Sequence, residues 1–463
     1  MVNKMRVGMV MCALLASGAG QVSAKPNPAV DASLRAGRPF VAGELLVQFK
    51  AGASEASKSA ALSKRGAKAA QKLLDKAARK DAKGDLIKAQ LGKGAKVDAA
   101  LIAQLAADPA VEYVEPNWIY KTQLANPNDP GLNMLWGMQG ATTSPASPYG
   151  SGALAGWNAG ALCSSKVLVG IIDEGVMLTH SDLRANAWVN PGEGSRADRK
   201  DNDRNGLVDD RLGWDFAANN AGVYDGPADD HGTHVAGTIA ALANNAAGVF
   251  GVCPTAKFVN AKFLGANGGT TADAVKAINY LTQLKLQQKL RLVATNNSWG
   301  GGGYSQALYD AIKAAGDADI LFVAAAGNSG LDIDATPSYP ASYALPNVIS
   351  VGAIDQNGRR AGFSNYGVKN VHIAAPGVDI VSTVPTSTGA AGYAYMSGTS
   401  MAAPHVTGAA ALYASLNPCA TAVQIREALL RTAVIDPQLT GAVQQNRRLD
   451  VSKLRAELNC SAP

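Results

Sequence analysis

The sequence predicts an α/β protein: a doubly wound parallel sheet with helices on both faces, preceded by a small α+β domain. In residues 126–463, continuous apolar runs alternate with helical patterns, which is typical of buried parallel strands. The length of 463 residues exceeds what one compact core usually holds. Glycine is frequent and charged residues make up only 17% of the chain, so we expect tightly packed domains rather than a disordered chain.

The N-terminus reads as a secretory signal peptide over residues 1–24. Lys4 and Arg6 precede an apolar run that ends near Ala19, and small residues follow up to Ala24. The run is too short to span a bilayer. A lipid anchor on Cys12 is the alternative, but the apolar run continues past that residue. We therefore expect a secreted protein without a membrane anchor.

A small α+β domain is predicted at 43–120, within a segment that covers residues 25–125. It has strands at 43–50 and 110–120 and helices at 54–82 and 97–107. Residues 121–131, "KTQLANPNDPG", form a polar, proline-rich joint, of the kind that separates domains and is readily cleaved.

The second domain, residues 126–463, supplies the strands and helices of the main sheet. Strands are predicted at 166–173, 256–264, 291–299, 319–327, 347–354 and 371–377, and helices at 233–243, 271–288, 304–316, 400–416 and 421–432. In such sheets the reactive groups gather beyond the carboxyl ends of the strands.

The positive charge of the chain is confined to its N-terminal part. Residues 25–125 hold 17 Lys and Arg against 10 Asp and Glu, whereas residues 126–463 hold 23 against 26. The basic excess thus lies outside the larger domain, and a nucleic-acid partner is not expected.

Three polar residues are placed where parallel strands or helices present reactive groups. Asp173 directly follows an apolar strand and is either a helix cap or a buried orienting group, and His231 opens a helix. A metal pair of His231 with His234 is disfavoured, because no third ligand follows at the spacing of a zinc-protease helix. The chain order Asp, His, Ser is one known order of a catalytic triad.

Ser400 stands at the start of an almost entirely apolar helix. Pro404 cannot donate to the carbonyl four residues back, so the helix tolerates it only if Ser400 lies at the helix start. There the Ser400 N–H is unpaired and would face an oxyanion formed by attack of its oxygen. Asn328, after the strand that ends at Gly327, supplies a second donor. The alternative is that Ser400 merely caps the helix.

The segments "IIDEGV", "HGTHVAGT", "AAAGNSG" and "GTSMAAPHV" resemble the signature blocks of the subtilisin-like serine proteases, over roughly residues 130–435. The resemblance implies a sheet of about seven strands and a secreted serine endopeptidase that acts through an acyl-enzyme. It implies a triad of Asp173, His231 and Ser400, with Asn328 and the Ser400 N–H as the oxyanion hole. Glu174 departs from the family pattern.

The resemblance also implies where a peptide substrate would lie. The substrate-binding residues it indicates are Ser298, Trp299, Gly300, Ala325, Ala326, Gly327 and Ser338. They are uncharged, which favours broad specificity with apolar or medium-sized side chains before the cut bond. Asp332 and Asp334 lie close by in sequence and leave this point open.

The small domain resembles the inhibitory propeptides of the same family. We therefore expect an autoprocessed zymogen whose own propeptide is an intramolecular inhibitor, with cleavage between Lys121 and Asp129. The partners expected are protein or peptide substrates, and the mature enzyme is expected to be a monomer.

Two acidic regions are candidates for structural calcium. Oxygen-bearing side chains surround Gly206, in a spacing that suits a hard cation: Asp201, Asp203, Asn205, Asp209 and Asp210. Leu212 stands where the closing Glu of an EF-hand would be, and a solvated acidic turn is the alternative. The second candidate joins Asp182 with Asn245 and is similar to a calcium loop of the family.

Four cysteines remain beyond the signal peptide, in a protein expected to reach an oxidising compartment. They allow three pairings, and their positions favour Cys163 with Cys253 and Cys419 with Cys460. None has a CxxC spacing, so a zinc site is not expected.

Two other functions compete with the protease hypothesis. A catalytically dead member of the same fold could serve as a binding protein, but all four site residues are present. An esterase of the α/β-hydrolase kind would need a G-x-S-x-G elbow and a different triad order, and the sequence has neither.

Overall fold

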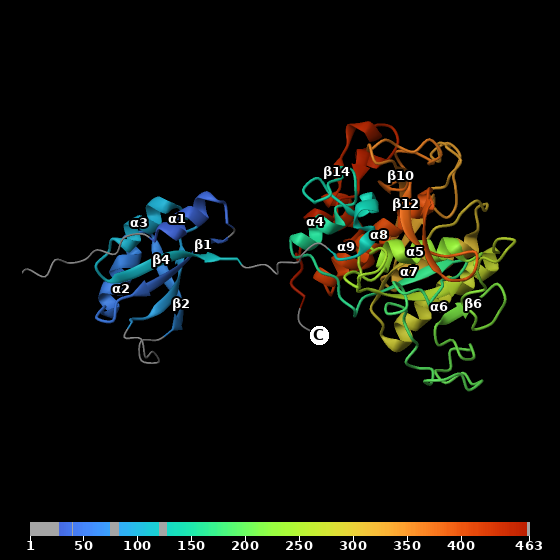
Figure 1. Cartoon of the computed structure of the whole chain (residues 1–463), viewed down its shortest axis with the longest axis horizontal. Coiled ribbons are helices and arrows are strands. Elements are labelled where there is room, and N and C mark those ends of the chain that lie inside the picture. Colours follow the sequence, from blue (N-terminus) through green and yellow to red (C-terminus); the bar gives the residue numbers. More distant parts are fainter. Residues whose placement is uncertain (1–26, 39, 75–82, 120–126, 461–463) are drawn as a thin grey trace, which may run out of the picture. The chain divides into compact units, whose positions relative to one another are not determined.

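The protein is described from a computed structural model, which covers residues 27–38, 40–74, 83–119 and 127–460. The predicted signal peptide and most of the predicted joint lie outside the described residues. The chain divides into two compact units, Met1–Thr122 and Gln123–Pro463, which we call the N-terminal and the C-terminal unit. Both units, with their elements labelled, are drawn in Figure 1.

The N-terminal unit is an antiparallel sheet covered by helices. Its strands, in the order β2-β3-β1-β4 across the sheet, are β1 (Phe40–Phe49), β2 (Ala67–Leu74), β3 (Leu86–Leu91) and β4 (Val111–Trp118). Its helices are α1 (Pro28–Arg35), α2 (Glu55–Ser63) and α3 (Ala99–Ala106). Leu45, Val47 and Phe49 of β1 are fully buried in its core.

The predicted helix over 54–82 is wrong for residues 64–74, and its residues 75–82 lie outside the described residues. Helix α2 ends at Ser63, Gly66 takes a φ of +67°, and the chain returns as the edge strand β2, paired with β3. The Lys- and Ala-rich composition favours a helix, but pairing with a neighbouring strand overrides that weak preference. Lysines on an edge strand also protect it from pairing with other chains.

The C-terminal unit is built on a nine-stranded sheet, in the order β14-β15-β11-β10-β9-β8-β5-β7-β6. The seven strands from β11 to β6 are parallel to one another. These are β5 (Leu168–Asp173), β6 (Gly213–Asp215), β7 (Lys257–Lys262), β8 (Leu292–Asn297), β9 (Leu321–Ala325), β10 (Val348–Ile354) and β11 (Ile373–Pro376), with β14 (Val434–Ile435) and β15 (Arg447–Arg448) at one edge. The predicted α/β fold class is confirmed.

Helices cover both faces of this sheet, as Figure 1 shows. One face carries α4 (Ala153–Asn158), α5 (Asp230–Ala240), α8 (Thr399–Leu416) and α9 (Ala422–Thr432). The other carries α6 (Thr271–Gln288) and α7 (Gln306–Asp317). A hairpin of β12 (Ile380–Pro385) and β13 (Ala391–Met396) forms a separate sheet. Short 3-10 helices lie at Pro130–Met134, Trp136–Met138, Pro437–Leu439, Gln444–Asn446 and Val451–Lys453.

Helix α8 runs through the core of the unit. Between Thr399 and Ala414, every residue except Ser400 is buried. Small side chains allow this depth: a Cβ on Gly408 would lie 2.6 Å from Cβ of Val252. At the N-terminal end of the helix, Ser400 is therefore the residue that reaches the surface.

Candidate active site

Asp173 and His231 are brought together at the carboxyl edge of the parallel sheet. Asp173 is the last residue of β5 and is fully buried, and its Oδ1 accepts from His231 Nδ1 at 2.8 Å. Gly232 makes this approach possible, since a Cβ there would lie 2.2 Å from the carbonyl oxygen of Gly175. A buried carboxylate bonded to Nδ1 fixes the tautomer in which Nε2 is free to take a proton.

The charge of Asp173 controls the protonation of His231. Burial lowers the pKa of the His231 imidazole, whereas the neighbouring Asp173 carboxylate raises it. The net effect is a pKa raised to about 9. Glu174 and Asp230 act in the same direction as Asp173. The site thus stabilises an imidazolium, which is the state that forms when a histidine takes a proton from a serine.

His234, one turn further along α5, has a different environment. Its Nε2 lies 2.8 Å from the carbonyl oxygen of Ile380, and burial lowers its pKa to about 4. It is therefore a neutral core residue whose ring nitrogen is engaged by the hairpin backbone.

Ser400 is held at the start of α8 by the end of strand β8. The side chain of Ser298 donates to the Ser400 carbonyl at 2.8 Å, and Ser400 Oγ donates to the Ser298 carbonyl at 3.2 Å. The Ser400 carbonyl is the one that Pro404, inside α8, cannot serve. Ser298 thus satisfies the acceptor that the proline leaves open, and in doing so it fixes the serine backbone.

Asn328 lies beside the same helix start. Its side-chain oxygen accepts from the N–H and from the hydroxyl of Thr399, each at 2.8 Å. A Cβ built on Gly398 would lie 3.4 Å from Asn328 Nδ2 and 3.6 Å from Ser400 N. Both nitrogens therefore lie at contact distance from one point beside Gly398, and a side chain at position 398 would occupy that point. Two converging donors are what a developing oxyanion requires.

A groove of about 370 Å³ lies along the strand ends, and Trp299 and Gly300 of the predicted binding residues line it. Sequence reasoning missed its other wall, which includes Phe263, Leu264 and Tyr339. Phe263 and Leu264 follow strand β7, whereas Tyr339 lies between β9 and β10. Their spacing in the sequence gave no local signal, and only the fold brings them together.

The remaining predicted binding residues lie deeper or beside the groove. Ala325 and Ala326 are buried, and Ser338 Oγ would lie 3.5 Å from a Cβ on Gly327. Asp334 accepts from the backbone N–H groups of Lys369 and Asn370, at 2.9 and 2.8 Å. Asp332 accepts from the N–H of Asp334 at 2.9 Å. Asp332 thus holds its own loop, and Asp334 joins that loop to the segment before β11.

The acidic loop gathers a different set of residues from the one predicted. Carboxylate oxygens of Glu193, Asp201 and Asp203 lie within 4.8 Å of one another. Asp209 instead accepts from the backbone of 198 and 199, and Asp210 accepts from the Tyr280 hydroxyl at 2.8 Å. Asn205 donates its amide to Asp203 and Asp210. Of the five predicted residues, two belong to the cluster, and the third member, Glu193, comes from an earlier turn that gave no local signal.

The second predicted pair does meet. Asp182 is fully buried and accepts from Asn245 Nδ2 at 3.0 Å and from Val249 N at 3.1 Å. Asp129, which was not predicted, joins this loop by accepting from Asn244 N at 2.8 Å. Burial raises the pKa of Asp129, and the charge of Asp182 raises it further. The charge of Asp182 therefore disfavours the ionised form of Asp129.

The cysteines form the two disulfides that their positions favour, Cys163 with Cys253 and Cys419 with Cys460. The first joins the segment before β5 to the segment before β7. The second fastens the C-terminal tail to the turn between α8 and α9.

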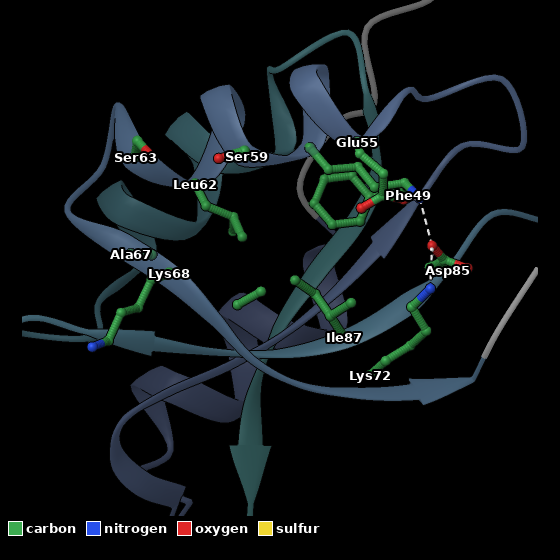
Figure 2. Close-up of a pocket in the computed structure, with 12 residues that line it drawn as sticks. Phe49, Glu55, Ser59, Leu62, Ser63, Ala67, Lys68, Lys72, Asp85 and Ile87 are labelled. Carbon is green, nitrogen blue, oxygen red and sulfur yellow. Dashed lines mark hydrogen bonds and ion pairs between the residues drawn. The ribbon is translucent and has the colours of Figure 1, made fainter.

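The N-terminal unit has a pocket of its own, between α2, β2 and β3 (Figure 2). Asp85 lies at one end of it and pairs with Lys58 at 2.5 Å and with Lys72 at 3.3 Å. Lys58 also pairs with Glu55 at 2.6 Å. These charges neutralise one another within the unit, so we assign the pocket to the packing of this unit and not to a reaction.

Two family profiles match the chain. The subtilase family matches residues 164–454, more than half of the chain, and the fervidolysin N-terminal prodomain matches residues 26–117. The two matches fall within the two units of the structure.

Individual relatives agree with these profiles. The chain is 36% identical over 421 residues to the thermophilic serine proteinase of Bacillus sp. (strain AK1). The aligned region covers 90% of this chain and 88% of that protein. It is 41% identical to subtilisin Savinase of Lederbergia lenta, over 59% of this chain and 85% of that one. An extracellular protease of Xanthomonas campestris is 35% identical to this chain, and the alignment covers 72% of this chain and 56% of that protease.

Among solved structures, a protease from Pseudoalteromonas arctica superimposes with a TM-score of 0.55 and 28% identity, over 71% of this chain and 98% of that one. In the described ranges, the helices are too short or too polar to cross a membrane.

Proposed function

The chain belongs to the subtilase family of serine endopeptidases, and on that premise we propose that Ser400 is the nucleophile that attacks the peptide bond. His231 is the general base that takes the hydroxyl proton and later returns it to the leaving amine. Asp173 holds the imidazole, and Asn328 with the Ser400 N–H binds the oxyanion. The proposal rests above all on the 2.8 Å bond between Asp173 and His231, two residues 58 positions apart in sequence.

The nucleophile is tested with the precursor and its Ser400→Ala variant. A fluorophosphonate is expected to label the wild-type protein at Ser400, and the variant is expected to take no label and to cleave no denatured protein. Unchanged hydrolysis by Ser400→Ala would show that another residue attacks the substrate.

The substrate range proposed is broad, with apolar or medium-sized residues before the cut bond. The groove walls Phe263, Trp299 and Tyr339 are aromatic, and the nearby Asp332 and Asp334 are occupied by backbone N–H groups. Mass spectrometry of the fragments of a denatured protein gives the residue before each cut. Strict cleavage after Lys or Arg would contradict this range.

The protein is further proposed to be made as a secreted zymogen: signal peptide 1–24, propeptide 25–125 and enzyme 126–463. The match of the prodomain profile and the extracellular relatives support this organisation. The propeptide inhibits the enzyme until cleavage between Lys121 and Asp129. Wild-type precursor should shorten at this joint, whereas Ser400→Ala should stay at full length.

Calcium is proposed as a structural ion held by Glu193, Asp201 and Asp203, and at a second site by Asp129 and Asp182. Clustered carboxylate oxygens are the donors that calcium prefers, and at both places acidic groups lie close together.

Removal of calcium should therefore shorten the half-life of the enzyme at high temperature. An ion present at about a hundred times its Kd stabilises the folded state by about 2.7 kcal/mol. The measurement is residual activity after heating with a chelator and after restoring calcium or magnesium. The variant Asp201→Asn/Asp203→Asn should lose part of the calcium response, and equal half-lives with and without chelator would exclude both sites.

A further inference from the structure

Glu174, the residue that departs from the family pattern, bonds to both Asp173 and His231. Its carboxylate accepts from the backbone N–H of His231 at 2.6 Å. Its own N–H donates to Asp173 Oδ1 at 2.9 Å, on the same oxygen that holds the imidazole. Its carbonyl accepts from the ammonium of Lys262. One residue thus ties the end of β5 to the start of α5 by its side chain and its backbone together.

The bond to His231 meets a need of helix α5. The first N–H groups of a helix have no partner within the helix, and the residue before this helix, Asp229, makes no capping bond with its side chain. Asp229 instead pairs with Lys262 at 2.9 Å and accepts from Asp225 N at 2.6 Å. The cap therefore comes from the residue that follows strand β5. A charged acceptor at a helix start forms a strong hydrogen bond.

Lys262 holds both Glu174 and the loop before α5 in place. It is 1% exposed and ends β7, the strand next to β5, where it lies in register with Asp173. Its ammonium contacts Asp229 and Asp225 in the loop before α5 as well as the Glu174 carbonyl. The backbone of Glu174 and the approach to α5 are thus anchored to one buried cation.

We propose that Glu174 is a positioning residue of the triad, which sets the imidazole of His231 against Asp173 and adds a negative charge beside it. The inference rests on the triad proposed above. Glu174 acts through His231, and its hydrogen bonds among the described residues are to Asp173, His231 and Lys262.

The charged groups that face the Glu174 carboxylate are Asp173, His231 and Asp230, with Lys262 at its backbone. Burial raises the pKa of Glu174, and the Asp173 charge raises it further, to about 7. Above that range Glu174 is ionised and favours protonated His231. Loss of its charge should therefore let His231 act as a base at lower pH.

The test compares Glu174→Ala with Glu174→Gln by steady-state kinetics, with active sites counted by phosphonate labelling. Glu174→Ala removes the acceptor of the His231 N–H, so kcat should fall about 10- to 100-fold while KM changes less than about 3-fold. Glu174→Gln keeps an acceptor oxygen but no charge. It should recover most of kcat and should move the acidic limb of kcat/KM to lower pH.

Asp230→Asn is the matched control, because it removes a neighbouring charge that makes no hydrogen bond to the His231 N–H among the described contacts. It should keep kcat and shift the acidic limb less than Glu174→Gln does. If Glu174→Ala has the wild-type kcat and pH profile per labelled site, the positioning role is wrong even though Ser400→Ala is inactive. If Glu174→Ala does not fold, an unmoved acidic limb in Glu174→Gln overturns the proposal. Activity that survives Ser400→Ala would instead remove its premise.

Discussion

At the scale of single residues, the site depends on polar groups that neighbouring hydrogen bonds hold in place. The side-chain oxygen of Asn328 is taken by Thr399, which turns the amide nitrogen toward the space above Gly398. The Ser400 carbonyl is taken by Ser298. Preorganised donors of this kind need little rearrangement during the reaction, which is why they contribute to the rate.

Asn328→Ala should therefore lower kcat and leave substrate binding nearly unchanged. The expected loss is about 10²- to 10³-fold, the magnitude known for removal of such a donor in a subtilisin. Kinetics on a small peptide substrate measure both constants. A variant whose KM rises while kcat stays at the wild-type value would place Asn328 in substrate binding instead.

The pH dependence of the reaction should follow His231. The base must be neutral to accept a proton, and the pKa of His231 is raised to about 9. Hence kcat/KM should rise with pH, about ten-fold per unit on the acidic side, and level off in the alkaline range. A profile that is already flat from acidic to neutral pH would contradict this assignment of the base.

The site residues that the sequence predicts and the contact residues that it does not indicate differ in one respect. Asp173, His231, Asn328 and Ser400 each stand next to a strand end or a helix start, where the local pattern identifies them. The parts played by Thr399, Asp129 and Glu193 depend on which distant segment their side chains face. That direction is set by the packing of the whole unit, so no local spacing encodes it.

At the scale of elements, α5 and α8 each begin at the sheet edge and are held there by residues that follow strands. Ser298 follows β8 and serves α8, and Glu174 follows β5 and serves α5. Both helices thereby take their position from the sheet rather than from a capping side chain of their own. The register of β5 with β7 then also places Lys262 beside the loop that leads into α5.

Lys262→Met should destabilise the C-terminal unit strongly. It leaves the buried Asp229 without its cation, and breaking a buried pair from one side costs about 3–5 kcal/mol. Urea denaturation in the Ser400→Ala background measures the free energy of unfolding. Adding Asp229→Asn should recover part of the loss, and Lys313→Met, which removes an exposed pair with Asp317, should have no measurable effect. Equal stability of Lys262→Met and its parent would show that the pair contributes little.

The elements themselves were predictable where their patterns are strong. Helix α6 begins and ends at the predicted residues, since Thr270 caps it and Lys289 closes it in a left-handed conformation. Strand β2 and the hairpin of β12 and β13 were missed. β2 carries a helical composition, and the hairpin is split by a turn within a stretch of small and polar residues.

At the scale of the whole molecule, the two units differ in how clearly their sequences indicate their strands. In the C-terminal unit, strands that are apolar throughout specify a sheet buried on both faces, so its fold class could be derived from the sequence. In the N-terminal unit the strands alternate and the edge strand is basic, so composition alone misleads. Strands β14 and β15 form one outer edge of the sheet. Their place there follows from the path of the C-terminal segment and not from any local pattern.

The depth of α8 has a consequence for how long the protein lasts in solution. Because nearly all of this helix is enclosed, its backbone amides should exchange with deuterium only when the entire unit opens. We therefore expect the segment that carries the hydroxyl of residue 400 to lose its structure together with the rest of the unit. The working lifetime of each molecule is then governed by the rare event in which it opens completely.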